Sequence, residues 1–354
     1  MKIYIRSSAC ISAQKTFGRA GFSEEPVEYT GNRLPIIEPE YADLIDPKLI
    51  RRMSRIIRMG VAAAQECLRA GNVKMPGAVI TGTAYGCLED TISFLTRMIE
   101  GKEEMLPPTA FIQSTHNTVA AQIALMLKCH AYNNTFVHKG ISFESALQDA
   151  AMLLMEKEAD NILVGGSDEM TDASFTILSR LGLYKREPVS NLSLFTTNSK
   201  GTIGGEGAAF FLLTDKQAGD NLAELTGTQT FYRPGSNDEI DRKIISFLNL
   251  YQLNPNDIDL FITGKNGDLK NDEVYSRLSQ SIFKNTPIAN FKHLCGEYPT
   301  SSAFALWLAA YTIKNGKVPE AIKEKREAEI SPKKILVLNH YMHKYYSLIL
   351  VSAC

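Results

Sequence analysis

Residues 133–172 of this chain read NNTFVHKGISFESALQDAAMLLMEKEADNILVGGSDEMTD. Residues 135–137 form a short β-prone run, and residues 161–164 are almost all apolar, which is typical of a strand covered on both faces. Between them, apolar residues recur at the spacing of one buried helix face. This face comprises Phe143, Ala146, Leu147, Ala150, Ala151 and Leu154. The stretch therefore predicts strand, sharp turn, helix and strand, the unit of an α/β protein.

The corner between the first strand and the helix has the sequence His138, Lys139, Gly140, Ile141. Such corners suit a nucleophile, because the positive end of the helix dipole stabilises an anion. None of these four residues is a good nucleophile. Ser142 is predicted to cap the helix start through its hydroxyl. The corner thus has the scaffold for covalent chemistry and lacks the reacting group.

The composition indicates a globular α/β protein with two packed halves. The 354 residues are 44% hydrophobic and 22% charged, and the net charge of -1 gives no reason to expect nucleic acid or a membrane surface as partner. The six cysteines include no CxxC pair. We therefore expect free thiols and neither a disulfide framework nor a zinc site. We found no secretory signal, membrane span or nucleotide motif, so we expect a cytoplasmic protein without cofactor or metal.

The chain repeats its own order of elements. The sequence AVITG at 78–82 is echoed by LFITG at 260–264, and residues 216–222 are polar. We predict two similar halves, residues 1–216 and 217–354, related by a pseudo-twofold axis. In the first half we also expect one helix over residues 47–70, a chain break at 106–109 and a helix over 118–127.

Several short motifs follow one another in the order found in one enzyme family. They are RMSR at 52–55, PTAF at 108–111, HN at 116–117, the strand and loop at 160–172, GEGA at 205–208, ND at 271–272 and KHLCG at 292–296. With all of these motifs in that order, the chain resembles the condensing enzymes along nearly its whole length. These are the β-ketoacyl-acyl carrier protein synthases of the thiolase fold. The resemblance implies two βαβαβαββ halves in five layers, α-β-α-β-α, and a dimer.

The catalytic positions of that family are occupied by other residues. Its members use a cysteine to take the acyl chain, and two histidines to assist decarboxylation and stabilise the enolate. By the motif spacing, the cysteine position is Gly140 and the first histidine position is Gly264. The second is Glu297, with His293 close by in the sequence as an alternative. The sequence has no cysteine between residues 130 and 294 and no histidine between 139 and 292.

The segment before the last strand also departs from the family. Where condensing enzymes have a Phe- and Gly-rich gate, residues 339–346 read NHYMHKYY. Glycines let a backbone swing, whereas His, Lys and Tyr do so at higher cost. We therefore expect a plugged or restructured pocket mouth.

The resemblance is closest in character to chain-length-factor subunits, inactive copies that pair with an active ketosynthase. It implies a heterodimer with such a ketosynthase, an acyl carrier protein as further partner, and a role in fatty acid, polyketide or aryl polyene-type biosynthesis. Two alternatives are a divergent synthase or acyltransferase with a non-standard nucleophile, Ser142, Lys139 or Cys295, and a homodimeric acyl-binding scaffold. The candidate residual pocket comprises Lys139, Ser142, Lys292, His293, Cys295 and His340.

Overall fold

The computed structural model describes residues 1–22, 25–104, 106–325 and 329–354. Its main sheet has ten strands in the order β10-β9-β11-β12-β8-β1-β7-β5-β3-β4. The first half supplies β1 (Tyr4–Ile11), β3 (Ala78–Gly82), β4 (Tyr132–Phe136), β5 (Asn161–Asp168) and β7 (Gly207–Thr214). The second half supplies β8 (Ala223–Tyr232), β9 (Leu260–Thr263), β10 (Ile288–Asn290), β11 (Lys334–Tyr341) and β12 (Tyr345–Ser352).

The two halves have the same topology. Numbered along the chain within each half, both sets of five strands lie in the order third, second, fourth, fifth, first. The first three strands of each half are followed by a helix. These helices are α2 (Arg55–Ala70), α5 (Thr118–Leu127) and α6 (Ser142–Met155), and then α8 (Asn237–Leu250), α9 (Leu269–Gln280) and α11 (Ser302–Asn315). Both halves are therefore βαβαβαββ units, as the repeat in the sequence predicts.

The halves meet along a short seam between β1 and β8. Only Tyr4 with Glu224 and Ile5 with Ala223 pair across it as strand residues. By comparison, β1 and β7 pair along nearly their full length, from Tyr4 with Thr214 to Ile11 with Ala208. The ten strands therefore behave as two five-stranded sheets that join at one edge.

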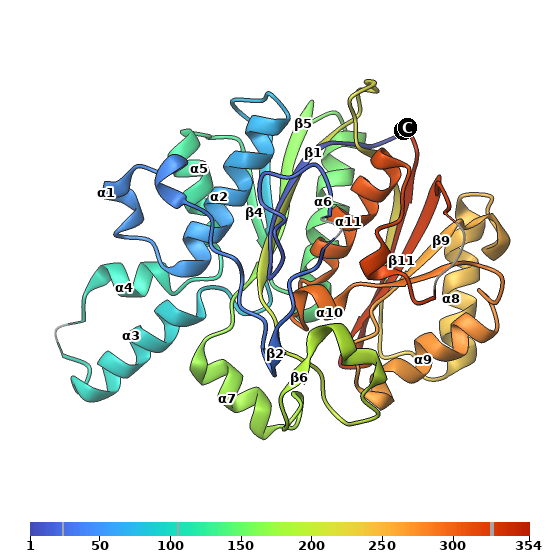
Figure 1. Ribbon diagram of the computed structural model, residues 1–354. Helices are drawn as coiled ribbons and strands as arrows, with labels where there is room; N and C mark the ends of the chain where they lie inside the picture. The colour runs from blue at the N-terminus through green and yellow to red at the C-terminus, as the bar shows by residue number, and fades with distance from the viewer. Residues whose placement is uncertain (23–24, 105, 326–328) are drawn as a thin grey trace.

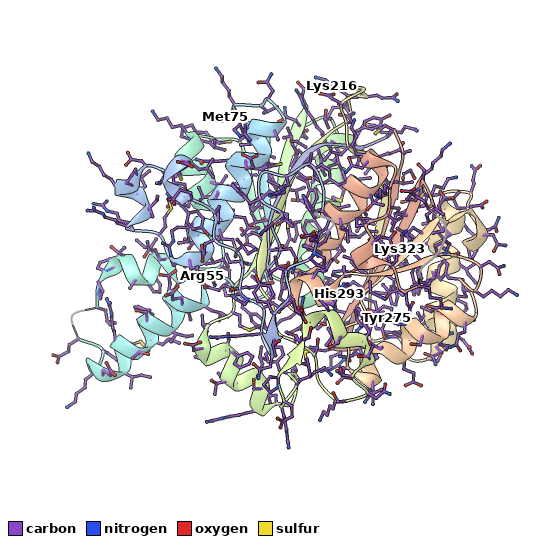
Figure 2. All side chains as sticks on the ribbon, viewed as in Figure 1. Arg55, Met75, Lys216, Tyr275, His293 and Lys323 are labelled. Atoms are coloured by element: carbon purple, nitrogen blue, oxygen red, sulfur yellow. The ribbon has the colours of Figure 1, made fainter. Side chains whose placement is uncertain are left out.

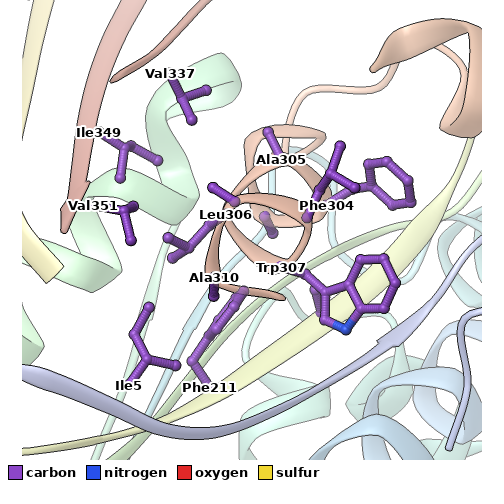
Figure 3. Packing of buried hydrophobic residues seen from close by; sticks show 14 of the residues in the cluster. Ile5, Phe211, Phe304, Ala305, Leu306, Trp307, Ala310, Val337, Ile349 and Val351 are labelled. Atoms are coloured by element: carbon purple, nitrogen blue, oxygen red, sulfur yellow. The ribbon is translucent and has the colours of Figure 1, made fainter. Parts of the chain in front are cut away.

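The helices complete a five-layer arrangement (Figure 1). One apolar core contains residues of α6 and α11 packed between the two sheets. A second lies between α2, α5 and the first sheet, and a third between α8, α9 and the second sheet. Figure 3 shows α11 in the central layer, where Phe304, Leu306 and Trp307 pack near Phe211 and Ile349 of the strands. This is the thiolase-like α-β-α-β-α fold.

Several shorter elements lie outside these layers. They are α1 (Pro47–Ile50), α3 (Leu88–Glu100), α4 (Pro108–Gln113), α7 (Asp172–Arg180), α10 (Lys292–Cys295) and the small β2–β6 pair (Thr30–Gly31 with Val189–Ser190). In Figure 1, α3 and α4 extend away from the main body. Every residue of α3, α4 and α7 remains at least partly exposed. No helix in the described ranges is both long and apolar enough to cross a membrane.

The local predictions were wrong at three points. The helix expected over 47–70 is broken into α1 and α2, and buried Met53 lies in the break against the second core. Pro108 begins α4 rather than only breaking the chain, because proline suits the first turn of a helix. Ser142 does not cap α6. It is the first residue of that helix, and its hydroxyl accepts from His138 N–H and donates to the Lys139 carbonyl, both at 2.8 Å.

Candidate functional site

Three segments that are distant in the sequence meet at the carboxyl end of β11. Gly140 lies in the 3₁₀ turn η2 (Lys139–Ile141) that leads into α6. Gly264 follows β9, and Glu297 follows α10. Each of them contacts, directly or through one side chain, the consecutive β11 residues 339–341. The fold thus brings the predicted positions to one place.

The side chain of Tyr341 fills the space beside Gly140. A Cβ at Gly140 would lie 3.0 Å from the Cγ of Tyr341 and closer still to its Cβ. These are the near atoms of the tyrosine, which cannot turn aside as the far end of a flexible side chain can. Tyr341 is buried, and its hydroxyl lies 3.4 Å from that of Tyr85. In this arrangement the corner has no room for a nucleophilic side chain.

Two polar side chains fill the space beside Gly264. A Cβ there would lie 2.6 Å from the hydroxyl of Tyr275 and also against Oδ1 of Asn339. The Tyr275 hydroxyl accepts the backbone N–H of His340 at 2.8 Å, which fixes its position. Figure 2 labels Tyr275. A histidine at Gly264 would require both neighbours to move.

A buried ion pair occupies the third position. The Lys292 ammonium donates to both carboxylate oxygens of Glu297, at 2.9 and 2.8 Å, and lies 3.3 Å from the His340 carbonyl. Asn266 Nδ2 donates to Glu297 at 2.6 Å. Lys292 is 0% exposed. The carboxylate therefore neutralises a cation in a dry interior, and as an anion it offers no donor for an enolate oxygen.

His340 lies close to this ion pair, but its ring turns away into an aromatic stack. The ring is nearly parallel to that of Tyr275, with centroids 5.0 Å apart, and 4.3 Å from that of His343. Its Nε2–H donates to the Asn271 carbonyl at 2.9 Å. Burial lowers the pKa of His340 well below its usual value. A neutral, stacked imidazole with its proton committed to a carbonyl has a structural role.

His293 and Cys295 lie on α10, and neither is poised for catalysis. His293, labelled in Figure 2, contacts the Ala321 carbonyl through Nε2 at 2.8 Å, and its ring packs edge-on against Phe195. Cys295 is fully buried, and burial raises the pKa of its thiol well above the usual value. Because a thiol must ionise to attack, this environment suits an inert core cysteine.

The two remaining candidates border the turn at Gly140. Lys139 is exposed, has a positive φ of 53° and places its ammonium 4.5 Å from the centre of the Tyr85 ring. Ser142 is buried with its hydroxyl engaged by the turn. Ser145, not Ser142, contacts the ring of His138, at 2.9 Å, and it also donates to the Ile141 carbonyl.

Sequence reasoning missed Glu144, a buried carboxylate next to the site. Glu144 lies on α6, four residues after Gly140, and is 0% exposed. Neither of its carboxylate oxygens has a hydrogen-bond partner among the described residues. Burial raises its pKa, although the hydroxyls of Ser302 and Ser347 are near enough to oppose this effect. Its position between Phe143 and Ala146, on the apolar face, could have signalled burial.

A small cavity of about 190 Å³ is lined in part by Tyr341. We call it the tyrosine cavity, because Tyr85, Tyr184, Tyr298 and Tyr341 line it together with Met170 and Glu169. Apolar residues of α3 and α7 close its sides. Sequence reasoning did not find it, because its walls come from segments that are far apart along the chain.

The groups around Gly140, Gly264 and Glu297 are packed or paired rather than free. Burial raises the pKa of the Cys295 thiol, the Lys292 ammonium is paired with Glu297, and the Lys139 ammonium lies over the Tyr85 ring. Ser145 contacts the His138 ring, but its hydroxyl donates to the Ile141 carbonyl. Within the described ranges, no group of three or more His, Cys, Asp or Glu side chains is placed to hold a metal ion. The geometry is suited to a fixed, closed structure at the place where the fold would carry out chemistry.

The buried state of His293 predicts a loss of stability in acid. Burial lowers its pKa from 6.5 to about 4, so the folded state favours the neutral ring. The contribution of neutral His293 to the free energy of unfolding is fully present above pH 6.5. It is lost as the pH falls toward the pKa of the folded state. Between pH 7 and pH 5 the wild type should lose about 2 kcal/mol more than His293→Asn, measured by urea unfolding. The exposed His130→Asn is the control, and an equal loss in all three proteins would contradict the assignment.

Comparison with known proteins places this architecture in a family. The profile of the family described as "Beta-ketoacyl synthase, N-terminal domain" matches residues 38–218, just over half of the 354 residues. The fold is that of thiolase-like ketosynthases. The chain belongs to the β-ketoacyl synthase family. The comparison with curated proteins gives no match.

Several solved structures have the same fold at low sequence identity. The chain is 16% identical to "The ishigamide ketosynthase/chain length factor", with TM-score 0.80 and coverage of 100% of this chain and 99% of that one. A β-ketoacyl synthase from Burkholderia phymatum STM815 is 15% identical to this chain, with TM-score 0.80 and coverage of 100% of this chain and 99% of that one. A chain of the complex of the ketosynthase ApeO with its chain length factor ApeC, from Xenorhabdus doucetiae, is 15% identical. Its TM-score is 0.76, with coverage of 100% of this chain and 98% of that one. At these identities the likeness concerns the fold.

Proposed function

We propose that this chain is a ketosynthase-fold subunit without condensing chemistry of its own, which pairs with an active β-ketoacyl synthase as a chain-length-factor-like partner. The observation that carries the proposal is the packing of Tyr341 against Gly140, which fills the nucleophile corner of an otherwise complete fold. The Lys292–Glu297 ion pair and the packing at Gly264 support the same reading. The pathway would produce a fatty acid, a polyketide or an aryl polyene-type product.

An exposed apolar surface supports the pairing. Leu95 and Ile99 of α3 are 43% and 74% exposed, and Phe111 and Ile112 of α4 are 59% and 63% exposed. Strand β4 ends the sheet, so one side of its backbone is open for pairing. Single exposed apolar residues are ordinary, but a group of them on two helices that extend from the body is typical of a protein interface.

The partner supplies what this chain lacks. A subunit with a cysteine and two histidines would take the acyl group from an acyl carrier protein and extend it. This chain would contribute one wall of the space that holds the product. The tyrosine cavity would form part of that space, since Tyr341, which packs against Gly140, also lines the cavity.

Co-purification tests the pairing. An affinity-tagged full chain, expressed in the source cells, should recover a cysteine-bearing β-ketoacyl synthase in equal amount. Phe111→Glu with Ile112→Glu should release that partner, because it places charges in the apolar surface, whereas Leu250→Glu on the exposed side of α8 should not. Incubation with acyl-carrier protein and intact mass measurement should show acylation of the partner alone. A stable homodimer without a synthase, or an acyl adduct on this chain, would contradict the proposal.

A further inference from the structure

The tyrosine cavity has flat and rigid walls. The ring of Tyr184 stacks on Phe175, with centroids 5.2 Å apart and an angle of 10° between planes, and the Arg33 guanidinium lies 5.4 Å from the Phe175 centroid. Gly204 lets Tyr184 and Met170 come close to the backbone, since a Cβ there would lie 2.9 Å and 2.6 Å from them. These contacts hold the ring in place. Aromatic faces and a thioether favour an aromatic ligand over a flexible alkyl chain.

One carboxylate interrupts these apolar walls. Glu169 is 6% exposed and lines both the tyrosine cavity and the adjoining cleft of about 590 Å³ near Arg33 and Arg55. One of its oxygens accepts the Glu89 N–H at 3.0 Å. No donor among the described residues reaches its other oxygen. Burial, with nearby Glu89 and Asp90, raises its pKa to about 7. A ligand that fills the cavity would remove solvent from this oxygen, and a ligand hydroxyl would offset that desolvation cost.

We propose that the tyrosine cavity binds the hydroxyaryl end of an acyl chain, with the phenol hydroxyl donating to Glu169. The inference rests on the proposed function and assigns its ligand class. The tyrosine rings pack against the aryl ring, and Glu169 recognises its hydroxyl. A saturated acyl chain would leave the Glu169 oxygen buried and unpaired, which is the arrangement that gives strong discrimination between ligands.

Three thioester probes separate the two recognition elements. N-acetylcysteamine thioesters of 4-hydroxycinnamic, cinnamic and octanoic acid are titrated into the full chain, alone and with its co-purified partner, by calorimetry. The hydroxycinnamoyl probe should bind at least about tenfold more tightly than the cinnamoyl probe. The cinnamoyl probe should in turn bind more tightly than the octanoyl probe.

Matched variants assign each preference. Glu169→Leu should abolish the preference for the hydroxyl, while Glu169→Gln, which keeps an acceptor oxygen, should retain most of it. Tyr184→Leu should reduce the preference for an aryl ring and leave the hydroxyl preference intact. Glu100→Leu, at the exposed end of α3, is the control for loss of charge. Circular dichroism checks that each variant is folded.

Two results would overturn the inference. One is octanoyl binding as tight as hydroxycinnamoyl binding, and the other is an unchanged hydroxyl preference in Glu169→Leu. These results are separate from the test of pairing. Selective aryl binding by a chain that never recovers a synthase would refute the proposed function and keep this ligand assignment. Pairing with a synthase without aryl selectivity would keep the proposed function and refute the ligand assignment.

Discussion

Replacing Lys292 with methionine is expected to cost about 3–5 kcal/mol of folding free energy, one of the two largest effects predicted for a single side chain here. The ammonium contacts both oxygens of Glu297, and both residues are buried, with side chains 0% and 8% exposed. Methionine fills a similar volume, so the loss is electrostatic. It leaves Glu297 with the Asn266 amide as its remaining side-chain donor among the described residues.

The second substitution that tests this reading is Glu297→Gln in the Lys292→Met background. Removing both charges should recover most of the lost stability, because an uncompensated buried carboxylate, rather than the lost attraction, accounts for the cost. Urea unfolding of both single variants and the double variant measures the coupling. Should the single variant fail to fold, a folded double variant still reports the rescue.

A surface pair provides the control. Lys216 and Asp160 are 3.4 Å apart with side chains 68% and 79% exposed, so Lys216→Met should cost no more than about 1 kcal/mol. Equal costs at Lys216 and Lys292, or a double variant no more stable than Lys292→Met, would show that Glu297 is not held as a buried ion pair. Glu297 would then be free to take part in chemistry.

Sequence periodicity was sufficient for much of this fold. The helix at 118–127 and the stripe from Phe143 to Leu154 were predicted correctly, because spacing along one helix face is a local signal. The repeat of AVITG by LFITG identified two equivalent strands, β3 and β9, which are each the second strand of their half. Matching element order along the chain therefore carried more information than any single motif.

Local signals failed where tertiary packing decides the backbone. No glycine or proline marks the break between α1 and α2. It coincides with the burial of Met53 in the core that α2 shares with the first sheet. Residues 339–346, where we expect a plugged or restructured pocket mouth, are mostly strand. Strand β11 continues to Tyr341 before a tight turn in which Met342 and His343 both have positive φ. Non-glycine residues in that conformation give no turn signal in the sequence.

Motif spacing named three positions, but it could not say what surrounds them. Motif spacing pointed to Gly140, Gly264 and Glu297, and these positions do meet at β11. Tyr341, about 200 residues further along the chain, fills the space beside Gly140, and Asn339, about 75 residues further along, joins Tyr275 beside Gly264. A single sequence shows a missing side chain, whereas only the packing shows whether the vacated space remains open.

Restoring a cysteine at Gly140 is expected to destabilise the protein by about 2–3 kcal/mol without creating a condensing enzyme. The new Cβ would meet the Cβ and Cγ of Tyr341, so β11 or the η2 turn must shift. Gly219→Cys is the matched control, because a Cβ there has no atom within 4 Å and should cost almost nothing. Urea unfolding measures both costs.

A double-mutant cycle identifies the cause. In a Tyr341→Gly background, Gly140→Cys should lose at least about 1 kcal/mol of its cost, because the atoms that it would meet are gone. Even there, intact mass after incubation with acyl-carrier protein and malonyl donor should show no completed condensation. Gly264 and Glu297 provide no donor for the enolate that decarboxylation forms. Two results would mean that the catalytic space is still open: a Gly140→Cys variant as stable as the wild type, or one that turns over malonyl donor unaided. The partner would then be unnecessary.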